Sequence, residues 1–139
     1  MRWNLTQSTY QFNRWKLEQS ETAEIKYNKA SHSFRITASD KRLFFIDKTG
    51  FFQNKFLVRT EYSVIAAEIH PKKMNSGIMV FDNKKYHYEL KEKSITVSRN
   101  KDQFLLCVEI DDTTPLDQLE LYSLLFSTLR AVVFQPVVA

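Results

Sequence analysis

The chain has 139 residues, of which 43% are hydrophobic, 26% charged and 14% aromatic. This length is typical of one domain and allows a core to form without disulfides or metals, so we expect residues 1–139 to form a single domain. Only two glycines and three prolines occur, which argues against a glycine-rich phosphate loop and against a disordered linker. The single cysteine, Cys107, excludes an internal disulfide and is predicted to be a small buried residue.

The charges are divided unequally along the chain. Residues 1–101 contain 19 basic and 10 acidic side chains, whereas residues 102–139 contain one basic and six acidic side chains. The body of the protein is therefore basic, which is compatible with an anionic phospholipid or an acidic protein as partner. The first residues lack the apolar run of a signal peptide, so the expected location is the cytoplasm, including the inner face of the membrane.

The first thirty residues are compatible with strands or with a polar helix over residues 12–26, and their aromatic side chains favour strands. Beyond them, period-two alternation and short apolar runs predict further antiparallel strands up to residue 110. These strands are expected within residues 34–38, 43–46, 56–69, 78–81, 86–90, 95–97 and 104–110. Turn-forming residues are expected to connect them at residues 47–50, 72–77, 82–85 and 99–102.

The C-terminal segment predicts a helix over residues 115–134. Thr114 and Pro115 suit the cap and the first position of a helix, and Asp117 favours the positive end of its dipole. Apolar residues then fall on nearly every face, which is typical of a helix buried on all sides or placed in a membrane. Only nine uncharged residues separate Glu120 from Arg130, far fewer than the roughly 20 that a span requires. We therefore expect the preceding strands to surround this helix.

An antiparallel β chain wrapped around a hydrophobic C-terminal helix resembles the tubby C-terminal-like superfamily, which includes the phospholipid scramblases and the LURP-one-related proteins. Residues 44–50 look like the strand–turn unit of this family, and residues 55–68 are similar to its next strand pair. The resemblance implies a closed barrel of about a dozen strands with one helix along its axis. It also implies a scaffold whose relatives include phosphoinositide-binding and membrane-associated proteins.

Two other folds fit parts of the same pattern. A pleckstrin-homology-like sandwich has a suitable length and a C-terminal helix, but that helix caps an open end and is amphipathic. A fatty-acid-binding or lipocalin-like barrel would instead have a hollow interior. The hydrophobicity of the predicted helix on all its faces favours a barrel that the helix fills.

The sequence predicts no catalytic, metal or cofactor site. None of the three histidines has a second ligand at metal-binding spacing, and no nucleophile-elbow or glycine-rich phosphate motif occurs. His87 lies between Tyr86 and Tyr88 and is expected to face solvent while the two tyrosines face the core. We therefore expect a non-catalytic binding or scaffold domain. The alternative is a barrel that carries a small apolar ligand.

Basic residues near predicted turns and strand ends are the candidate contacts for an anion or lipid headgroup. They are Lys41, Arg42, Arg59, Lys72, Lys73, Lys84 and Lys85. The loops at residues 72–77 and 82–85 lie at opposite ends of one predicted strand, so they do not share one rim of the barrel. Lys84 and Lys85 more readily share a rim with Lys41, Arg42 or Arg59. Nucleic acid is not favoured, because no helix or aromatic platform accompanies these residues.

Overall fold

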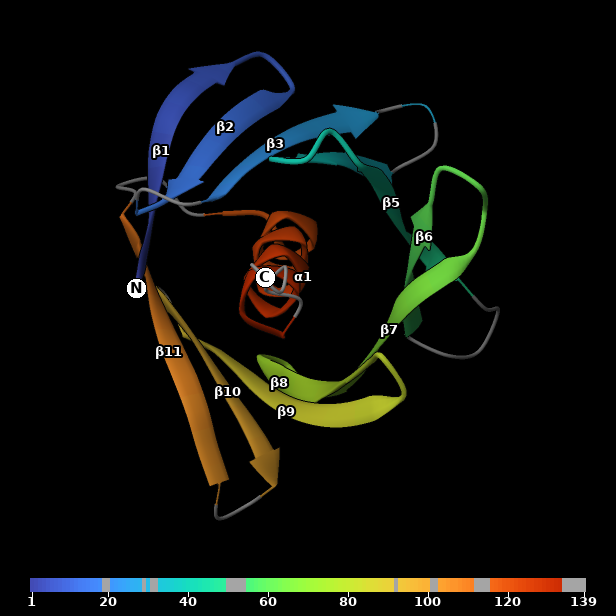
Figure 1. The fold of residues 1–139 in the computed structure, drawn as a ribbon, viewed down its shortest axis with the longest axis vertical. Helices are drawn as coiled ribbons and strands as arrows, with labels where there is room; N and C mark the ends of the chain where they lie inside the picture. Colours follow the sequence, from blue (N-terminus) through green and yellow to red (C-terminus); the bar gives the residue numbers. More distant parts are fainter. Residues whose placement is uncertain are drawn as a thin grey trace, which may run out of the picture.

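Alternation of apolar and polar residues organises the chain into eleven strands that form a closed barrel around one helix (Figure 1). The computed structural model describes residues 1–18, 21–28, 30, 33–49, 55–91, 93–100, 103–111 and 116–133. The strands are β1 (Arg2–Thr9), β2 (Phe12–Leu17), β3 (Glu21–Asn28), β4 (Ser33–Ala38), β5 (Leu43–Thr49), β6 (Lys55–Thr60), β7 (Ile65–Lys73), β8 (Ser76–Phe81), β9 (Lys84–Lys91), β10 (Ser94–Asn100) and β11 (Gln103–Asp111).

Each strand pairs with its neighbour in sequence in antiparallel fashion, and the barrel closes where β1 pairs with β11. This last pairing is parallel and joins residues 2–4 to residues 109–111. The predicted barrel region therefore agrees with the structure, and the described residues among the first thirty form β1, β2 and β3 rather than a polar helix.

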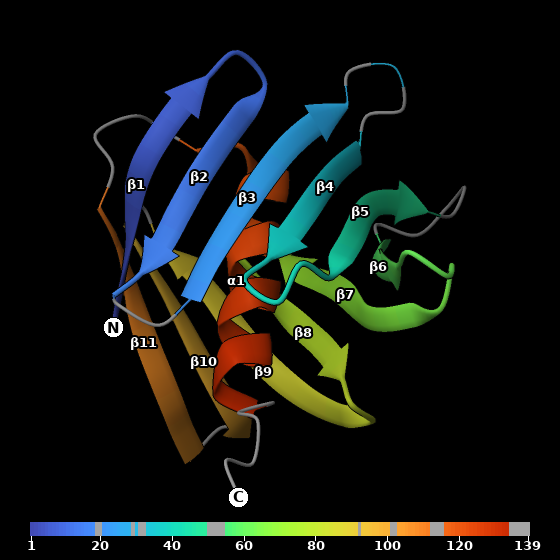
Figure 2. The same ribbon diagram turned by 45° about the horizontal axis from the view of Figure 1, so that its top comes forward.

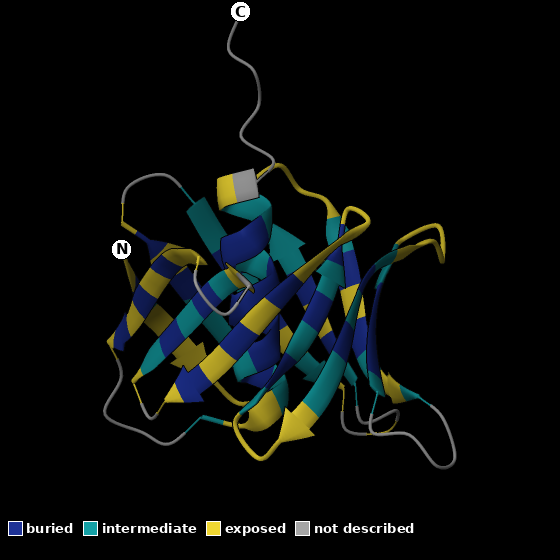
Figure 3. Cartoon of the chain, turned by 90° about the horizontal axis from the view of Figure 1, so that it is seen from below, coloured by how far each residue is buried: buried dark blue, intermediate teal, exposed yellow. Residues whose placement is uncertain are grey.

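Side chains along β9 show how alternation builds the wall. Tyr86, Tyr88 and Leu90 face inward and are buried, whereas His87 and Glu89 face outward and are exposed. The β8–β9 hairpin has a two-residue turn in which both residues have positive φ, as the tight hairpin turn requires. Figure 3 shows the same alternation of buried and exposed residues across the other strands.

The helix α1 (Gln118–Val133) is capped by Asp117, which directly precedes it. The backbone N–H of Leu119 donates a hydrogen bond of 2.8 Å to Oδ1 of Asp117. The helix cap therefore lies about one turn later than the cap expected at Thr114. Thr114, Pro115 and Phe134 lie outside the described residues. Over the described chain, no helix has the length and apolarity needed to cross a membrane.

The helix runs along the barrel axis, as Figures 1 and 2 show. Four apolar residues in its middle turns, Leu124, Leu125, Phe126 and Leu129, have at most 1% of their surface exposed. The indole N–H of Trp3 on β1 donates a 2.8 Å hydrogen bond to the hydroxyl of Thr128 and links the helix to the closing strand. The expected barrel with a buried axial helix is confirmed, and the pleckstrin-like alternative with a capping helix does not describe this fold.

Several local expectations differ from the structure. Residues 47–49 continue β5 instead of forming a turn, and the predicted loop at residues 72–77 contracts to a turn at residues 74–75 between β7 and β8. Cys107 is exposed rather than buried, because it faces outward between Leu106 and Val108. A shift in the pairing of β10 with β11 near Phe104 also leaves that side chain exposed.

The two ends of the barrel are distinguished by the direction of the helix. The end of the barrel that holds the first turn of α1 is called the helix-entry end. The turns at residues 10–11 and 74–75 lie there. The end that holds the last turn of α1 is called the helix-exit end. The turns at residues 39–42, 61–64 and 82–83 lie there. Alternate turns of an antiparallel meander lie at the same end, and an ion pair between Arg130 and Asp40 places the last helical turn beside the β4–β5 turn.

Candidate functional site

The seven predicted basic residues separate into three locations. Lys41 and Arg42 belong to the β4–β5 turn, and Lys84 and Lys85 begin β9, so these four lie at the helix-exit end. Lys72 and Lys73 end β7 at the helix-entry end. Arg59 lies on β6 between the inward-facing positions of that strand, on the outer wall near the helix-exit end. The structure therefore places Lys41, Arg42, Lys84 and Lys85 at one end of the barrel, and Lys72 and Lys73 at the other.

Two more arginines join this end of the barrel. Arg130 lies in the last turn of α1, where a cation is favourable beside the negative end of the helix dipole. Arg99 follows the inward-facing Ile95 and Val97 on β10, and its guanidinium lies 5.7 Å from the centre of the Tyr86 ring. The helix-exit end thus has cations on the wall and on the helix.

Arg42 and Arg130 both lie against the ring of Phe44. Their guanidinium carbons are 5.9 and 4.9 Å from the ring centre, distances that allow cation–π attraction. Each guanidinium also contacts a carboxylate: Arg42 Nε lies 2.9 Å from Glu61, and Arg130 Nη2 lies 2.6 Å from Asp40. A guanidinium has five N–H donors, so these contacts orient both arginines and leave other donors available.

Both carboxylates are held in their charged form. The backbone N–H of Leu43 and the guanidinium of Arg42 lower the pKa of Glu61. Partial burial alone would raise the pKa of Asp40, but hydrogen bonds from Arg130 and from the backbone of Arg42 outweigh burial and lower it. The two arginines are therefore fixed by charged partners at neutral pH.

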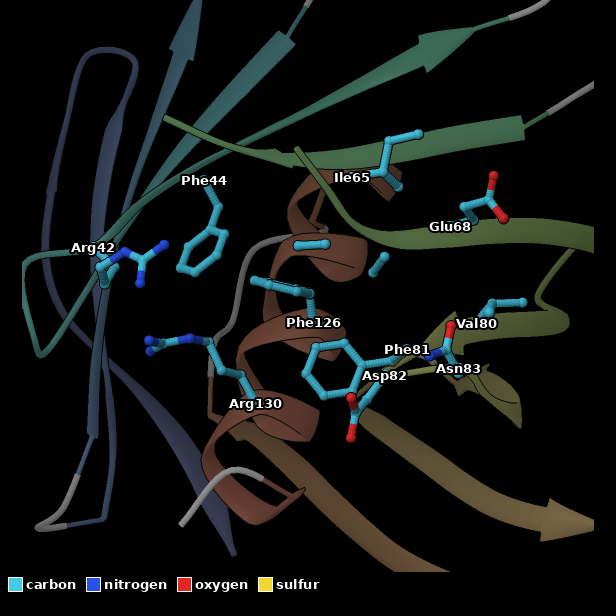
Figure 4. A pocket seen from close by; sticks show the side chains of 12 residues that line it. Arg42, Phe44, Ile65, Glu68, Val80, Phe81, Asp82, Asn83, Phe126 and Arg130 are labelled. Carbon is cyan, nitrogen blue, oxygen red and sulfur yellow. The ribbon is translucent and has the colours of Figure 1, made fainter. Parts of the chain in front are cut away.

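A cavity of about 550 Å³ opens beside these arginines, between α1 and the ends of β5, β7 and β8 (Figure 4). We call it the notch. Its inner wall contains the aromatic rings of Phe44, Phe81 and Phe126, and its outer part is lined by Glu68 and Asp82. In Figure 4 the guanidinium groups of Arg42 and Arg130 lie on the same side of the notch, next to Phe44.

Exposed apolar side chains also gather at the helix-exit end. Tyr62, Val64 and Ile65 in and beside the β6–β7 turn are 79%, 60% and 50% exposed. Val132 in the last turn of the helix is also exposed. Basic and apolar side chains therefore occur together at the helix-exit end, a combination typical of surfaces that bind anionic membranes. The helix-entry end also exposes single apolar side chains, Tyr10 and Met74, which are 83% and 85% exposed.

Sequence reasoning missed Arg99 and Arg130 as members of this group. Alternation through Ile95 and Val97 would have placed Arg99 on the inward face at a strand end, and a helix on the axis necessarily brings its last turn to the barrel mouth. Among the described residues, no group of three His, Cys, Asp or Glu side chains is arranged to hold a metal ion.

In comparisons with known proteins, the chain matches no family model, no curated protein and no solved structure. The geometry of the helix-exit end therefore carries the functional argument.

Proposed function

We propose that this protein is a non-catalytic binding domain that attaches to anionic lipid surfaces through its helix-exit end. The observation that carries this proposal is the gathering of exposed basic and exposed apolar side chains at that end. Lysine and arginine are attracted by lipid phosphates, while apolar turn residues gain free energy when they leave water for the interface.

The charges at this end are available to a ligand. Within the described part of the chain, Lys41, Lys84 and Lys85 form no ion pair, and all three side chains are exposed. Each lysine close to an anionic surface contributes about 1 kcal/mol, and this contribution fades beyond a Debye length of about 8–10 Å. Three or four such residues support weak, salt-sensitive attachment.

The apolar turn adds a contribution that salt does not screen. Tyr62, Val64 and Ile65 project from the β6–β7 turn with large exposed fractions. Burying apolar surface contributes about 25 cal/mol per Å², so even shallow insertion strengthens attachment. An acidic protein would be held by the same lysines, but it gives no comparable reason for an apolar turn beside them, which favours lipid as the partner.

The closed barrel around an axial helix supports a place among the tubby C-terminal-like barrels, and we include that assignment and a cytoplasmic location in the proposal. The exposed thiol of Cys107 is compatible with a reducing compartment. The alternative of a carrier with a hollow barrel is less well supported, because side chains of α1 occupy the interior.

Vesicle sedimentation tests the proposal. The wild-type chain is expected to sediment with vesicles of phosphatidylcholine containing phosphatidylserine or a phosphoinositide at low salt, and much less with pure phosphatidylcholine or at high salt. The double variant Lys84→Glu, Lys85→Glu should lose most of this binding. The matched variant Lys72→Glu, Lys73→Glu makes the same charge change at the helix-entry end and should retain it.

A third variant separates the apolar contribution from the charges. Val64→Ser with Ile65→Ser should weaken sedimentation at high and low salt alike, because it removes apolar surface without changing charge. Equal losses in the two lysine double variants would show that the attraction is non-specific. Absence of sedimentation with any anionic vesicle at low salt would refute lipid attachment.

A further inference from the structure

The notch at the helix-exit end has features that attachment to a surface does not require. Its two arginines come from separate elements, Arg42 from the β4–β5 turn and Arg130 from α1, yet both guanidiniums lie over one aromatic ring. Glu61 and Asp40 hold them from outside the cavity lining. Arginines oriented by carboxylates in this way present planar donor groups that suit bidentate recognition of an anion.

The wall beside the arginines is apolar and rigid. The Phe126 ring packs edge to face on Phe44 at 4.9 Å and on Phe81 at 5.7 Å between ring centres. All three rings are at most 4% exposed, so the packed core holds them in place. The cavity of about 550 Å³ falls within the range of about 300–1,000 Å³ that is usual for small-molecule sites.

Charge selects the kind of anion. Arg42 and Arg130 are already balanced by Glu61 and Asp40. The lining adds two more carboxylates, Asp82 and Glu68, of which Glu68 is paired with Lys55 at 2.7 Å. A dianion such as a phosphate monoester would therefore meet local repulsion from Asp82, whereas a carboxylate needs one negative charge only and matches the guanidinium fork.

We propose that the notch binds a small organic carboxylate, with its carboxylate between Arg42 and Arg130 and its apolar body along the exposed Ile65 and the half-buried Ala66, above the buried aromatic rings. This inference goes beyond the attachment to lipid surfaces and does not depend on it, because the ligand is soluble and the site is a cavity rather than an exposed rim.

Nuclear magnetic resonance titration of the full chain with 3-phenylpropionate tests this site. We expect saturable shifts confined to residues around the notch, and affinity about tenfold higher than for the neutral 3-phenylpropanamide, which cannot form the charged contact. Phenyl phosphate at a pH where it is a dianion should bind less tightly than 3-phenylpropionate. Equal affinity for the acid and the amide, or shifts spread over the whole surface, would overturn the proposal.

Two kinds of variant examine the arginines and the cavity separately. Arg42→Gln removes one guanidinium without touching the helix and should lower affinity about tenfold, while Lys72→Gln at the other end should leave it unchanged. Ala66→Leu narrows the notch without changing any charge and should also abolish saturable binding. If Arg42→Gln and Ala66→Leu fold with unchanged melting temperatures and still bind like wild type, the ligand does not occupy the notch.

Vesicle sedimentation of the same variants distinguishes the two proposals. Ala66→Leu is expected to block 3-phenylpropionate and to leave sedimentation unchanged, whereas Lys84→Glu with Lys85→Glu should do the reverse. A chain that fails to sediment but binds 3-phenylpropionate would refute lipid attachment alone, and the opposite result would refute the notch alone.

Discussion

The two ends of the barrel hold the same helix by different means. At the helix-entry end, the buried carboxylate of Glu120 accepts hydrogen bonds from Trp15 Nε1 at 3.0 Å and from Asn13 Nδ2 at 2.6 Å. The hydroxyl of Tyr122 accepts a bond from Gln118 and lies 3.3 Å from the hydroxyl of Tyr88. Trp15, Tyr88, Glu120 and Tyr122 are buried, whereas Asn13 is half-buried and Gln118 is exposed.

At the helix-exit end, beyond the buried Trp3–Thr128 hydrogen bond, a charged pair holds the last turn of the helix. Arg130 and Asp40 are joined at 2.6 Å, but 53% of the Asp40 side chain is exposed, and the Arg42–Glu61 pair is also partly exposed. An exposed ion pair contributes little to stability, whereas a buried polar group that loses its partner is costly. The helix-entry end therefore contributes stability, while the helix-exit end keeps its charges accessible to partners.

The largest effect is expected in the middle of the helix, where Phe126 packs among other aromatic rings. Phe126→Ala removes a ring that packs against Phe44 and Phe81, and should lower the free energy of unfolding by about 3–5 kcal/mol. Urea denaturation measures this loss. Val132→Ala in the exposed last turn is the control and should change stability by less than about 0.5 kcal/mol. Similar losses in both variants would contradict the axial packing of the helix.

A smaller but clear effect is expected at the helix-entry end. Glu120→Ala leaves the buried indole N–H of Trp15 without its acceptor, which should cost about 1–3 kcal/mol. It also removes the acceptor of the half-buried Asn13 amide, which should cost less. Glu120→Gln keeps one side-chain oxygen as acceptor and should cost less. Thermal unfolding followed by circular dichroism compares them. If Ala and Gln have the same effect, the two hydrogen bonds do not stabilise this end.

The smallest effect is expected at the helix-exit end and depends on pH. Asp40→Asn should lower stability by about 0.2–1 kcal/mol at neutral pH, because an exposed pair is weak. The pKa of Asp40 is lowered in the folded chain, so its stabilising contribution is complete above the unfolded value of about 3.9 and is lost as pH falls through the folded value.

Urea denaturation of wild type and Asp40→Asn at several pH values measures this contribution. The difference in stability between them should be constant near neutral pH and shrink in acid. A difference that grows as pH falls would contradict the assignment of Asp40 as a charged partner of Arg130.

Alternation along the strands and the apolar faces of the helix were sufficient to predict a barrel with an axial helix. The same reasoning predicted that Tyr86 and Tyr88 are buried and His87 exposed, because period two holds throughout β9. It failed for Phe104, because the register shift between β10 and β11 turns that side chain outward and no local signal marks the shift. Cys107 was expected to be buried because of its apolar neighbours, although alternation with Leu106 and Val108 places it on the outer face.

The candidate site was only partly predictable for a different reason. Turn positions identified Lys41, Arg42, Lys84 and Lys85, but which turns share an end depends on the number of strands between them. The number of strands could not be counted at residues 56–69, because their composition is that of one long strand. In the structure these residues belong to two strands, β6 and β7. Arg130 could be assigned to the site only once the direction of the helix inside the barrel was known.

The closure of the barrel between β1 and β11 has a consequence for folding. It joins Arg2 to Glu109, 107 residues apart, and Trp3 reaches Thr128 across 125 residues. Contacts between such distant residues slow folding, because a long loop must be ordered before they form. The helix that fills the barrel is also made after all the strands on the ribosome, so the growing chain exposes apolar strand faces until synthesis of α1 is complete. The barrel can therefore acquire its core only after both the strands and the helix have been made.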